Sequence, residues 1–325
     1  MLDEPLWMTE ADVVGLMSLS DAIGALQSAL LLEAEGRAAS MPKTMLQFGH
    51  SNLHALGGQL GDFVGTKTWA HTEGGTSPLL LLWRAADGQL AAVIEAFALG
   101  NLRTGGTSGL ATDWMARPDC DVLAIAGAGK QALSQVAGVM AVRPIRQVRV
   151  FSPTVGSRVA FANKVRDELS VDAVACESMA AACEGAGVVT LVTRAAKPFV
   201  DASMLAKGTH VNAVGSIGPD REEFAQDLFD RAGSVAVDSL HGVKTLSLEF
   251  KRRFEGSDWK GVDRLSGVIA SGRRRQPETD LSLFKAMGMG LSDVALAVHL
   301  LRQARERAVG RPIPVPRKVK PRLRG

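Results

Sequence analysis

The chain has 325 residues, 46% hydrophobic and 22% charged, which is typical of a soluble globular protein long enough for two domains. Six Lys and Arg residues and no acid lie in residues 311–325, so the formal charge of +3 belongs to this tail and does not indicate a nucleic-acid-binding surface. Apolar runs shorter than the roughly 18 residues of a membrane helix, an acidic start at residues 1–4 and three cysteines without C-x-x-C spacing predict a cytoplasmic protein with no membrane, metal or nucleic-acid partner.

Residues 7–115 are predicted to begin and end in helices, with antiparallel strands between them. Thr9 can cap a short helix with Asp12 at its third position. A longer amphipathic helix is expected from about Ser20 to Glu35, and another from Leu99 to Met115. Strands joined by hairpins are expected at residues 43–48, 53–60, 63–70, 79–84 and 89–95, with Asp87-Gly88 as the clearest turn.

From residue 120 the pattern alternates between strand and helix, which indicates a parallel sheet covered on both faces. The predicted segments are 120–126, 130–141, 146–151, 155–169, 171–175, 178–184, 186–192, 202–206, 208–214, 223–229 and 233–237. A less regular stretch follows, with the basic cluster Arg273–Arg275. A closing helix from about Ser292 to Val309 is expected to pack back on the first part of the chain.

These patterns predict an α/β protein in which a Rossmann-type doubly wound parallel sheet accompanies a smaller α+β domain. We assign residues 117–293 to the Rossmann domain and residues 1–116 with 294–310 to the smaller one. Residues 311–325 form a basic, proline-rich tail that we expect to be disordered.

A glycine-rich turn follows the first strand of the predicted parallel sheet. Gly127 permits the tight turn, Gly129 lets the backbone approach a pyrophosphate, and Ala132 allows close helix packing, with Lys130 and Gln131 between them. The phosphates would bind the free N–H groups of the helix that follows. Two glycines also occur in turns that serve packing alone, so spacing leaves both interpretations open.

The end of the second predicted strand bears on the choice of dinucleotide. An NAD site usually has an acidic residue here, whereas this chain has Ser152, Thr154 and Arg158. These side chains can hydrogen-bond and neutralise a 2′-phosphate, so we expect NADP(H), with NAD(H) as the alternative. Arg158 is otherwise an ordinary solvated residue.

Three cations stand out in the first part of the chain. Lys67 and Arg103 lie in apolar or glycine-rich surroundings, and Lys43 follows a proline. A single Lys or Arg is most often a surface charge, but this setting favours an anionic partner, for which a carboxylate substrate is suited. We interpret Asp238 and Asp293 as cofactor-side or structural carboxylates.

Four stretches together resemble the ornithine cyclodeaminase/mu-crystallin family, and they occur in that family's order. The resemblance covers about residues 7–309. It implies a Rossmann domain that binds NAD(P), a second domain that forms a homodimer and contributes to the substrate site, and an activity among cyclodeaminases, alanine dehydrogenases and ketimine or cyclic-imine reductases. The matching stretches are 95–106, 127–132, 212–222 and 283–288 with Asp293.

Carried over residue by residue, the resemblance makes Lys67 and Arg103 the carboxylate-binding, catalytic pair, and Lys43 matches a position often held by Arg. Ser216 is the telling departure, because cyclodeaminases place an Asp just after Asn-Ala-Val-Gly-Gly to handle the substrate amine. That acid is missing here. A Ser after Val-Gly is familiar in the reductase and dehydrogenase branch, which puts Ser216 among the cofactor-binding residues.

The resemblance therefore implies an NAD(P)H-dependent reductase of a cyclic imino or ketimine acid, such as 1-pyrroline-2-carboxylate converted to L-proline. The carboxylate would hold the substrate C2 opposite the nicotinamide, where hydride transfer needs mainly orientation and an electron-poor carbon. Alternatives are an ornithine cyclodeaminase with bound NAD, an alanine or other amino-acid dehydrogenase, and an NADPH-dependent protein that binds a small ligand without turnover.

Overall fold

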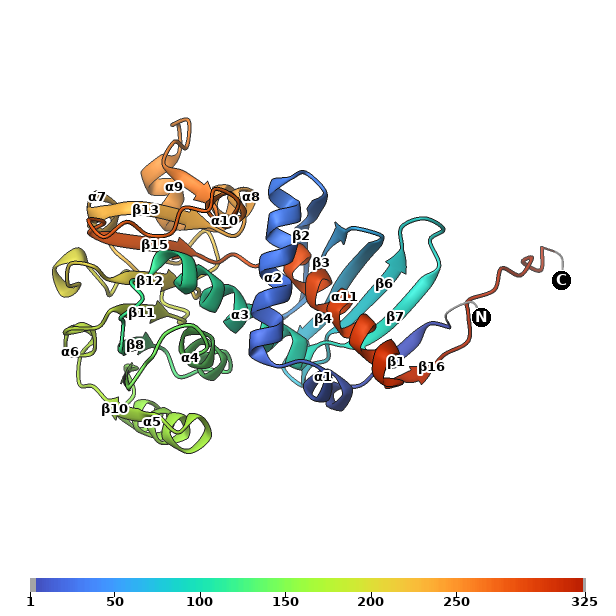
Figure 1. Cartoon of the computed structure of the whole chain (residues 1–325), viewed down its shortest axis with the longest axis horizontal. Coiled ribbons are helices and arrows are strands. Elements are labelled where there is room, and N and C mark those ends of the chain that lie inside the picture. Colours follow the sequence, from blue (N-terminus) through green and yellow to red (C-terminus); the bar gives the residue numbers. More distant parts are fainter. Residues whose placement is uncertain (1–3, 324–325) are drawn as a thin grey trace.

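Two sheets organise the chain in the computed structural model, which describes residues 4–323 (Figure 1). Within that range each sheet has eight strands. The parallel sheet and its helices confirm the predicted α/β class with a Rossmann-type region. Residues 1–3 of the acidic start and residues 324–325 of the tail lie outside the described range, and the domain boundaries remain a prediction.

The first sheet is a mostly antiparallel meander, as the five apolar segments predicted. Its strands follow the order β16-β1-β7-β6-β4-β3-β2, with β5 beside β4. The turn at Asp87-Gly88 is confirmed, and Gly88 has the positive φ of +67° that favours glycine. The strands are β1 (Leu6–Met8), β2 (Ala38–Phe48), β3 (Ser51–Leu60), β4 (Phe63–Thr72), β5 (Gly75–Thr76), β6 (Leu79–Arg84), β7 (Leu90–Glu95) and β16 (Arg311–Pro312).

Three helices pack on this sheet: α1 (Glu10–Leu16), α2 (Leu19–Ala34) and α11 (Gly290–Arg307). The helix α3 (Phe97–Met115) packs on α2 and α11 and reaches β12 and β15 of the second sheet. The predicted capping box is confirmed, because Thr9 and Asp12 exchange side-chain and backbone hydrogen bonds at the start of α1. The closing helix α11 contacts β2, β3 and β4, so it returns to the first sheet as predicted. Its buried face includes Asp293 in the first turn.

The second sheet is parallel throughout, in the order β10-β9-β8-β11-β12-β15-β13-β14. The chain adds β9 and β10 on one side of β8 and the later strands on the other side. The position between β8 and β11 is therefore the switch point where such sheets bind ligands. The strands are β8 (Val122–Ala126), β9 (Gln147–Phe151), β10 (Asp172–Ala175), β11 (Val188–Leu191), β12 (His210–Ala213), β13 (Ala232–Val237), β14 (Val262–Arg264) and β15 (Leu281–Lys285).

The helices of this region match the prediction until residue 237 and then depart from it. They are α4 (Ala132–Met140), α5 (Val155–Leu169), α6 (Met179–Cys183), the 3₁₀ helix η1 (Ala202–Met204) and α7 (Asp227–Arg231), which lies later than the predicted 223–229. The prediction of an irregular stretch after residue 237 is wrong. This stretch contains α8 (Leu240–Leu246), α9 (Leu248–Phe254), β14, α10 (Leu265–Ala270) and β15. All of them except the buried β15 are too short or too weakly periodic to recognise in the sequence.

Glycines allow α3 and α4 to cross in backbone contact. A Cβ at Gly105 would lie 2.2 Å from the Ser134 carbonyl oxygen, and one at Gly138 would lie 2.1 Å from that of Gly105. No larger residue fits this crossing. Because α4 starts at the glycine-rich turn, the crossing places α3, and Arg103 on it, beside that turn.

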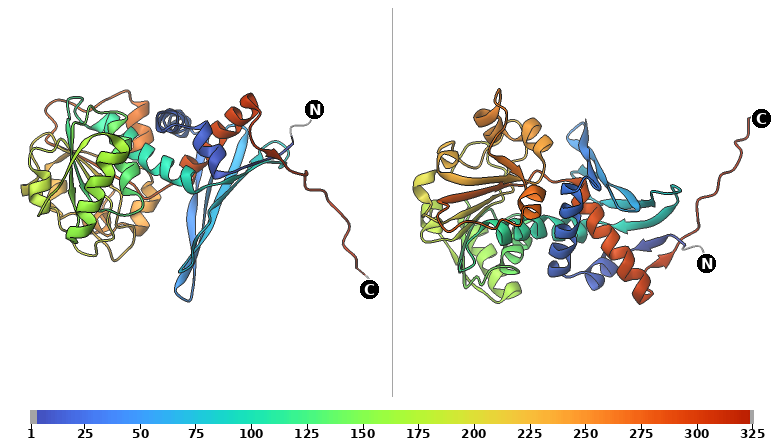
Figure 2. Two further views of the ribbon diagram at one scale, coloured as in Figure 1. Left: turned by 90° about the horizontal axis from the view of Figure 1, so that it is seen from below. Right: turned by 45° about the horizontal axis from the view of Figure 1, so that its top comes forward.

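The tail begins in the first sheet and then leaves it. Arg311 and Pro312 form β16, which pairs with Leu6 and Trp7 of β1, so the tail is ordered at its start. Residues 313–323 have no regular secondary structure and extend away from the two sheets (Figures 1 and 2). In the described range no single helix is long and apolar enough to cross a membrane; α1 and α2 reach that composition only as a pair bent by 84°.

Candidate functional site

A cavity of about 1130 Å³ lies between the two sheets, at the carboxyl ends of the parallel strands. This is the switch-point position at which doubly wound sheets bind ligands. The second sheet contributes to the cavity wall the turns after β8, β9, β11, β12 and β15. The first part of the chain contributes β2, β3, β4 and the helix α3. From the first part, the lining residues are Lys43, Leu56, Trp69, Arg103 and Thr104.

The glycine-rich turn has the shape of a phosphate cradle. Gly127 has a φ of +111° and a Cβ there would lie 2.7 Å from the Val192 carbonyl oxygen, whereas Gly129 has nothing within 4 Å of its Cβ position. Ala132 is fully buried. Gln131 makes no side-chain capping bond to α4, and the Ala132 N–H donates to the Gly129 carbonyl oxygen at 3.0 Å. These residues fit a dinucleotide pyrophosphate.

The residues predicted to select NADP(H) divide into two groups. Ser152 lines the cavity, together with the turn residues Lys130 and Gln131. Arg158 lies behind Ser152 and donates from Nη1 to its carbonyl oxygen at 3.1 Å. Thr154 is exposed and precedes α5 without a side-chain capping bond. Arg158 therefore has to turn from Ser152 to meet a 2′-phosphate.

The three predicted cations come together on the opposite wall. Lys67 donates to Asp293, and Arg103 Nε lies 3.5 Å from the same Oδ1 atom. The ammonium groups of Lys67 and Lys43 lie 5.3 and 6.0 Å from the centre of the Trp69 ring, a cation–π arrangement. Arg103 and Lys43 line the cavity, whereas Lys67 lies deeper, with 5% of its side chain exposed.

The charge of this cluster favours an anionic ligand. Three cations face one carboxylate, which leaves an excess of positive charge in a partly dehydrated place. Loss of solvation lowers the pKa of Lys43, and the Arg103 charge lowers it further. Loss of solvation likewise lowers the pKa of Lys67, and Asp293 opposes that shift. A bound carboxylate would relieve both effects.

Unsatisfied atoms point to the same place. Within residues 4–323, Arg103 Nε and Asp293 Oδ2 are buried without a hydrogen-bond partner, and Nε lies 3.5 Å from the other aspartate oxygen, Oδ1. Buried polar atoms rarely stay unpaired in a protein. The guanidinium lies over the backbone of Gly288, where a Cβ would come within 3.3 Å of Nη1. A ligand carboxylate would accept a hydrogen bond from Arg103 Nε, whereas Asp293 Oδ2 needs a ligand donor such as an N–H group.

Asp238 holds the loop over which Arg103 lies. Its two carboxylate oxygens accept from the backbone N–H groups of Met287 and Gly288 at 2.8 and 2.7 Å. Burial raises the pKa of this carboxyl, and the two backbone donors oppose the rise. Its contacts are those of a structural carboxylate.

Ser216 lies behind the cavity wall, so its position does not match the predicted cofactor contact. Its hydroxyl donates to the Ala195 carbonyl oxygen at 2.7 Å, and 2% of the residue is exposed. Its neighbours Gly215 and Ile217 line the cavity instead. Ser216 ties the turn after β12 to the turn after β11.

Sequence reasoning missed two groups of residues. Trp69 follows Lys67 by two positions in β4, and this spacing puts both on one face of the strand, which was a usable signal. No sequence pattern links Asp293 to Lys67, because they lie 226 residues apart. The turn after β11, residues 193–197, lines the cavity without a motif. No three His, Cys, Asp or Glu side chains in the described range are arranged to hold a metal.

Comparison with known proteins places these features in context. The model of the ornithine cyclodeaminase/mu-crystallin family matches residues 3–310. A Delta(1)-pyrroline-2-carboxylate reductase of Bacillus cereus is 32% identical, with 71% of this chain and 72% of that protein covered.

Two solved structures superpose over nearly the whole chain with a TM-score of 0.87 each. The Thermococcus litoralis Delta(1)-pyrroline-2-carboxylate reductase, in complex with NADH and L-proline, is 25% identical and covers 95% of this chain and 100% of its own. An archaeal alanine dehydrogenase dimer with bound NAD is 27% identical and covers 96% and 99%.

Proposed function

The chain belongs to the ornithine cyclodeaminase/mu-crystallin family, and we propose that it reduces a cyclic imino acid or ketimine acid with NAD(P)H. Its relatives make it an NAD(P)-dependent oxidoreductase that acts on C=N or CH–NH bonds. The proposed substrate is 1-pyrroline-2-carboxylate and the product is L-proline. The observation that carries the proposal is a cluster of cations facing the glycine-rich turn across one cavity.

Arg103 is the main substrate contact in this proposal. Its guanidinium is fixed by Asp293 and the Gly288 backbone and can form a bidentate pair with the substrate carboxylate. Lys43 adds a second positive charge from β2. Lys67 is committed to Asp293, so it reaches the carboxylate directly only if the substrate displaces that aspartate. Otherwise Lys67 keeps Asp293, and through it Arg103, in place.

Orientation is the contribution of the protein to the chemistry. The bound dinucleotide supplies the hydride, and a protonated imine provides an electron-poor carbon without a strong protein acid. Carboxylate binding at Arg103 fixes the distance and angle of the imine carbon to the opposite wall. Leu56 and Trp69 line the cavity beside the cations and exclude water from the reacting atoms.

The proposed cofactor is NADP(H), with NAD(H) as the alternative. Ser152 at the cavity and Arg158 behind it support a 2′-phosphate, and no acidic residue lines the cavity at residues 151–153. The solved relatives bind NADH and NAD, so the preference of this chain rests on these two residues.

One assay tests the substrate and the cofactor together. The purified protein is mixed with 1-pyrroline-2-carboxylate and either NADPH or NADH, and absorbance of the reduced nicotinamide is followed. We expect consumption of NADPH and formation of L-proline. Release of ammonia from ornithine with catalytic NAD, and no reaction of the imino acid, would make the chain a cyclodeaminase. Tight NADPH binding without any turnover would make it a binding protein.

An alanine dehydrogenase is the second candidate, because the archaeal dehydrogenase matches this chain as well as the reductase does in TM-score. The same cations would bind the pyruvate carboxylate. Pyruvate with ammonia and reduced dinucleotide, assayed beside the cyclic imino acid, separates the two activities by their kcat/KM values.

We also propose that the protein is a homodimer. Large apolar side chains on the β2–β3 hairpin are exposed, and the archaeal dehydrogenase of the same fold is a dimer. An exposed apolar patch on a soluble protein usually marks a contact surface. The exposed residues are Met41, Met45, Leu46, Phe48 and Leu53.

A further inference from the structure

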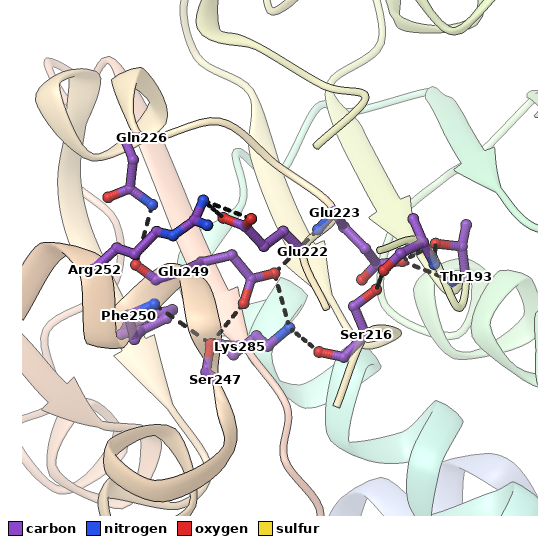
Figure 3. Close-up of polar contacts among 11 residues, drawn as sticks. Thr193, Ser216, Glu222, Glu223, Gln226, Ser247, Glu249, Phe250, Arg252 and Lys285 are labelled. Atoms are coloured by element: carbon purple, nitrogen blue, oxygen red, sulfur yellow. Dashed lines mark hydrogen bonds and ion pairs between the residues drawn. The ribbon is translucent and has the colours of Figure 1, made fainter. Parts of the chain in front are cut away.

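A buried charged cluster, drawn in Figure 3, lies behind the cavity wall, where β11, β12 and β15 end. Its members are Lys285 at the end of β15, Glu249 in α9 and Glu223, and none of the three is exposed to solvent. Burying charge is costly unless each group is paired. The chemistry proposed above uses none of these residues, so their position calls for another explanation.

Lys285 joins two segments that are distant in sequence. Its Nζ donates to the Ser216 carbonyl oxygen at 3.2 Å and lies 3.4 Å from Glu249 Oε1 (Figure 3). Glu249 is held in turn by the Glu223 backbone N–H at 3.1 Å and by the Ser247 hydroxyl at 2.7 Å. The ammonium therefore anchors the turn after β12 to a carboxylate that is itself fixed.

Glu223 supports the neighbouring turn from the same side. One carboxylate oxygen accepts from both the backbone N–H and the hydroxyl of Thr193, at 2.6 and 2.7 Å. It leaves no space at Gly215, where a Cβ would lie 2.3 Å from that oxygen. Thr193 and Gly215 both line the cavity, so the charged cluster backs the wall directly.

This wall belongs to one half of the dinucleotide site. In doubly wound sheets the two halves on either side of the switch point each bind one mononucleotide. Here β8, β9 and β10 form the half with the glycine-rich turn and Ser152, which takes the adenosine end. The turns after β11, β12 and β15 belong to the other half, which takes the nicotinamide end.

We propose that Lys285 is a positioning residue for the nicotinamide end of the dinucleotide. Its ammonium group bridges the Ser216 carbonyl oxygen and the Glu249 carboxylate. This bridge fixes the part of the cavity wall made by Val214, Gly215 and Ile217. This inference rests on the proposed function, because it requires a dinucleotide in the cavity.

The test compares NADH with ADP-ribose, which lacks the nicotinamide. In Lys285→Met we expect the Kd for NADH to rise roughly tenfold, by analogy with the low end of the loss seen when a group that orients a metal ligand is removed. The Kd for ADP-ribose stays the same, because the adenosine half is untouched. Calorimetry on the full-length protein measures both. Equal weakening of the two ligands would overturn the proposal.

A double variant separates positioning from charge balance. Lys285→Met alone leaves Glu249 without its cation and can destabilise the fold. Lys285→Met with Glu249→Gln removes both charges, so the melting temperature should recover while NADH binding stays weak, since the Ser216 tether is still missing. Recovery of NADH affinity along with stability would show that Lys285 only balances charge, and the proposal would be wrong.

The matched control is Arg252→Gln. Arg252 binds both carboxylate oxygens of Glu222 on the outer side of the same region, at 2.6 and 2.7 Å, and is 54% exposed. The Arg252→Gln substitution removes an ion pair without changing the cavity wall, so the Kd values for NADH and for ADP-ribose should be unchanged. A loss of NADH affinity matching that of Lys285→Met would contradict the proposal. The same comparison is made with NADPH and 2′-phospho-ADP-ribose, the matching pair for the favoured cofactor. If the wild-type protein binds none of these four ligands, the proposed function itself fails.

Discussion

Arg103 shows at the scale of single residues what a sequence reveals about a site. Its glycine-rich surroundings and family resemblance marked it as an anion-binding residue, and the structure places it on the cavity wall. The partner that orients it, Asp293, comes from a helix at the far end of the chain. Local patterns contain no information on such a pair, because only the fold brings the two residues together.

Arg103→Ala should separate substrate binding from cofactor binding. The guanidinium is expected to bind the substrate carboxylate, and removal of a charged hydrogen bond costs about 1.5–3 kcal/mol, or roughly 10- to 150-fold. We therefore expect KM for the imino acid to rise by that factor, with the Kd for NADPH nearly unchanged. Steady-state kinetics and calorimetry measure the two. A comparable loss in both would remove Arg103 from the substrate site.

His210 provides a prediction about pH. The ring is fully buried between Ser282 and Asn212, at 3.0 and 3.1 Å, and burial lowers its pKa from 6.5 to about 3. Between these two pKa values the imidazole of His210 is protonated in the unfolded chain and neutral in the folded protein. This histidine contributes stability above pH 6.5 that is lost as the pH falls from 6.5 toward 3.

His210→Gln keeps polar atoms at this site but cannot titrate. We expect its free energy of unfolding to fall less steeply with acid than that of the wild type, measured by urea unfolding across this pH range. The difference between the two profiles isolates the histidine from buried carboxyls such as Glu223 and Asp238, whose pKa values are raised by burial and which act in the opposite direction. Parallel profiles would contradict the assignment.

Helices and strands were predictable where they are long or regular. The Thr9 cap, the five apolar strands and the strand–helix alternation after residue 120 all identified elements correctly. Between residues 238 and 285 the prediction failed, because α8, α9, α10 and β14 are three to seven residues long. Elements of that size are stabilised by tertiary packing rather than by their own periodicity.

The close crossing of α3 and α4 makes Gly138 intolerant of a larger side chain. In Gly138→Ala the new methyl group meets the Gly105 carbonyl oxygen, so the helices must separate at a cost of about 1–3 kcal/mol. Thermal unfolding should show the loss. Arg103 shifts with α3, so KM for the substrate should also rise.

Gly24→Ala in α2 is the control for that change. Gly24 has nothing within 4 Å of its Cβ position, and alanine in an open helix position is favoured by roughly 0.5–1 kcal/mol. The control should therefore be equally or more stable than the wild type. If Gly138→Ala behaves like Gly24→Ala, the close crossing does not constrain these helices.

At the scale of the whole molecule, the cavity depends on how two sheets face each other. The glycine-rich turn and the cations are each recognisable in the sequence. Only the fold shows that they face each other across one cavity. Asn212 of β12 donates to the Thr112 hydroxyl of α3 at 2.9 Å, and α10 packs on α2, so the two parts contact each other at several places. The sequence indicated both halves of the site, and tertiary packing determined their distance.

The β2–β3 hairpin exposes large apolar side chains in the single chain. Met45 and Leu46 are consecutive residues of β2 and are 60% and 62% exposed. Successive strand residues point to opposite faces, so both faces of the hairpin are uncovered near Met45 and Leu46. Figure 2 shows the hairpin projecting from the rest of the molecule. A second copy of the chain would cover it.

Leu46→Glu should therefore weaken the proposed dimer. Burying a leucine side chain contributes about 1.5–3 kcal/mol. A two-fold symmetric interface contains each substituted residue twice, so the loss is doubled. Sedimentation velocity should show a shift from dimer to monomer.

Val14→Glu, on the 66% exposed Val14 of α1, is the control and should leave the dimer intact. Since Lys43 lies on the same strand as Leu46, the monomer should also have a higher KM for the substrate. A Leu46→Glu protein that still sediments as a dimer would exclude the hairpin as the interface.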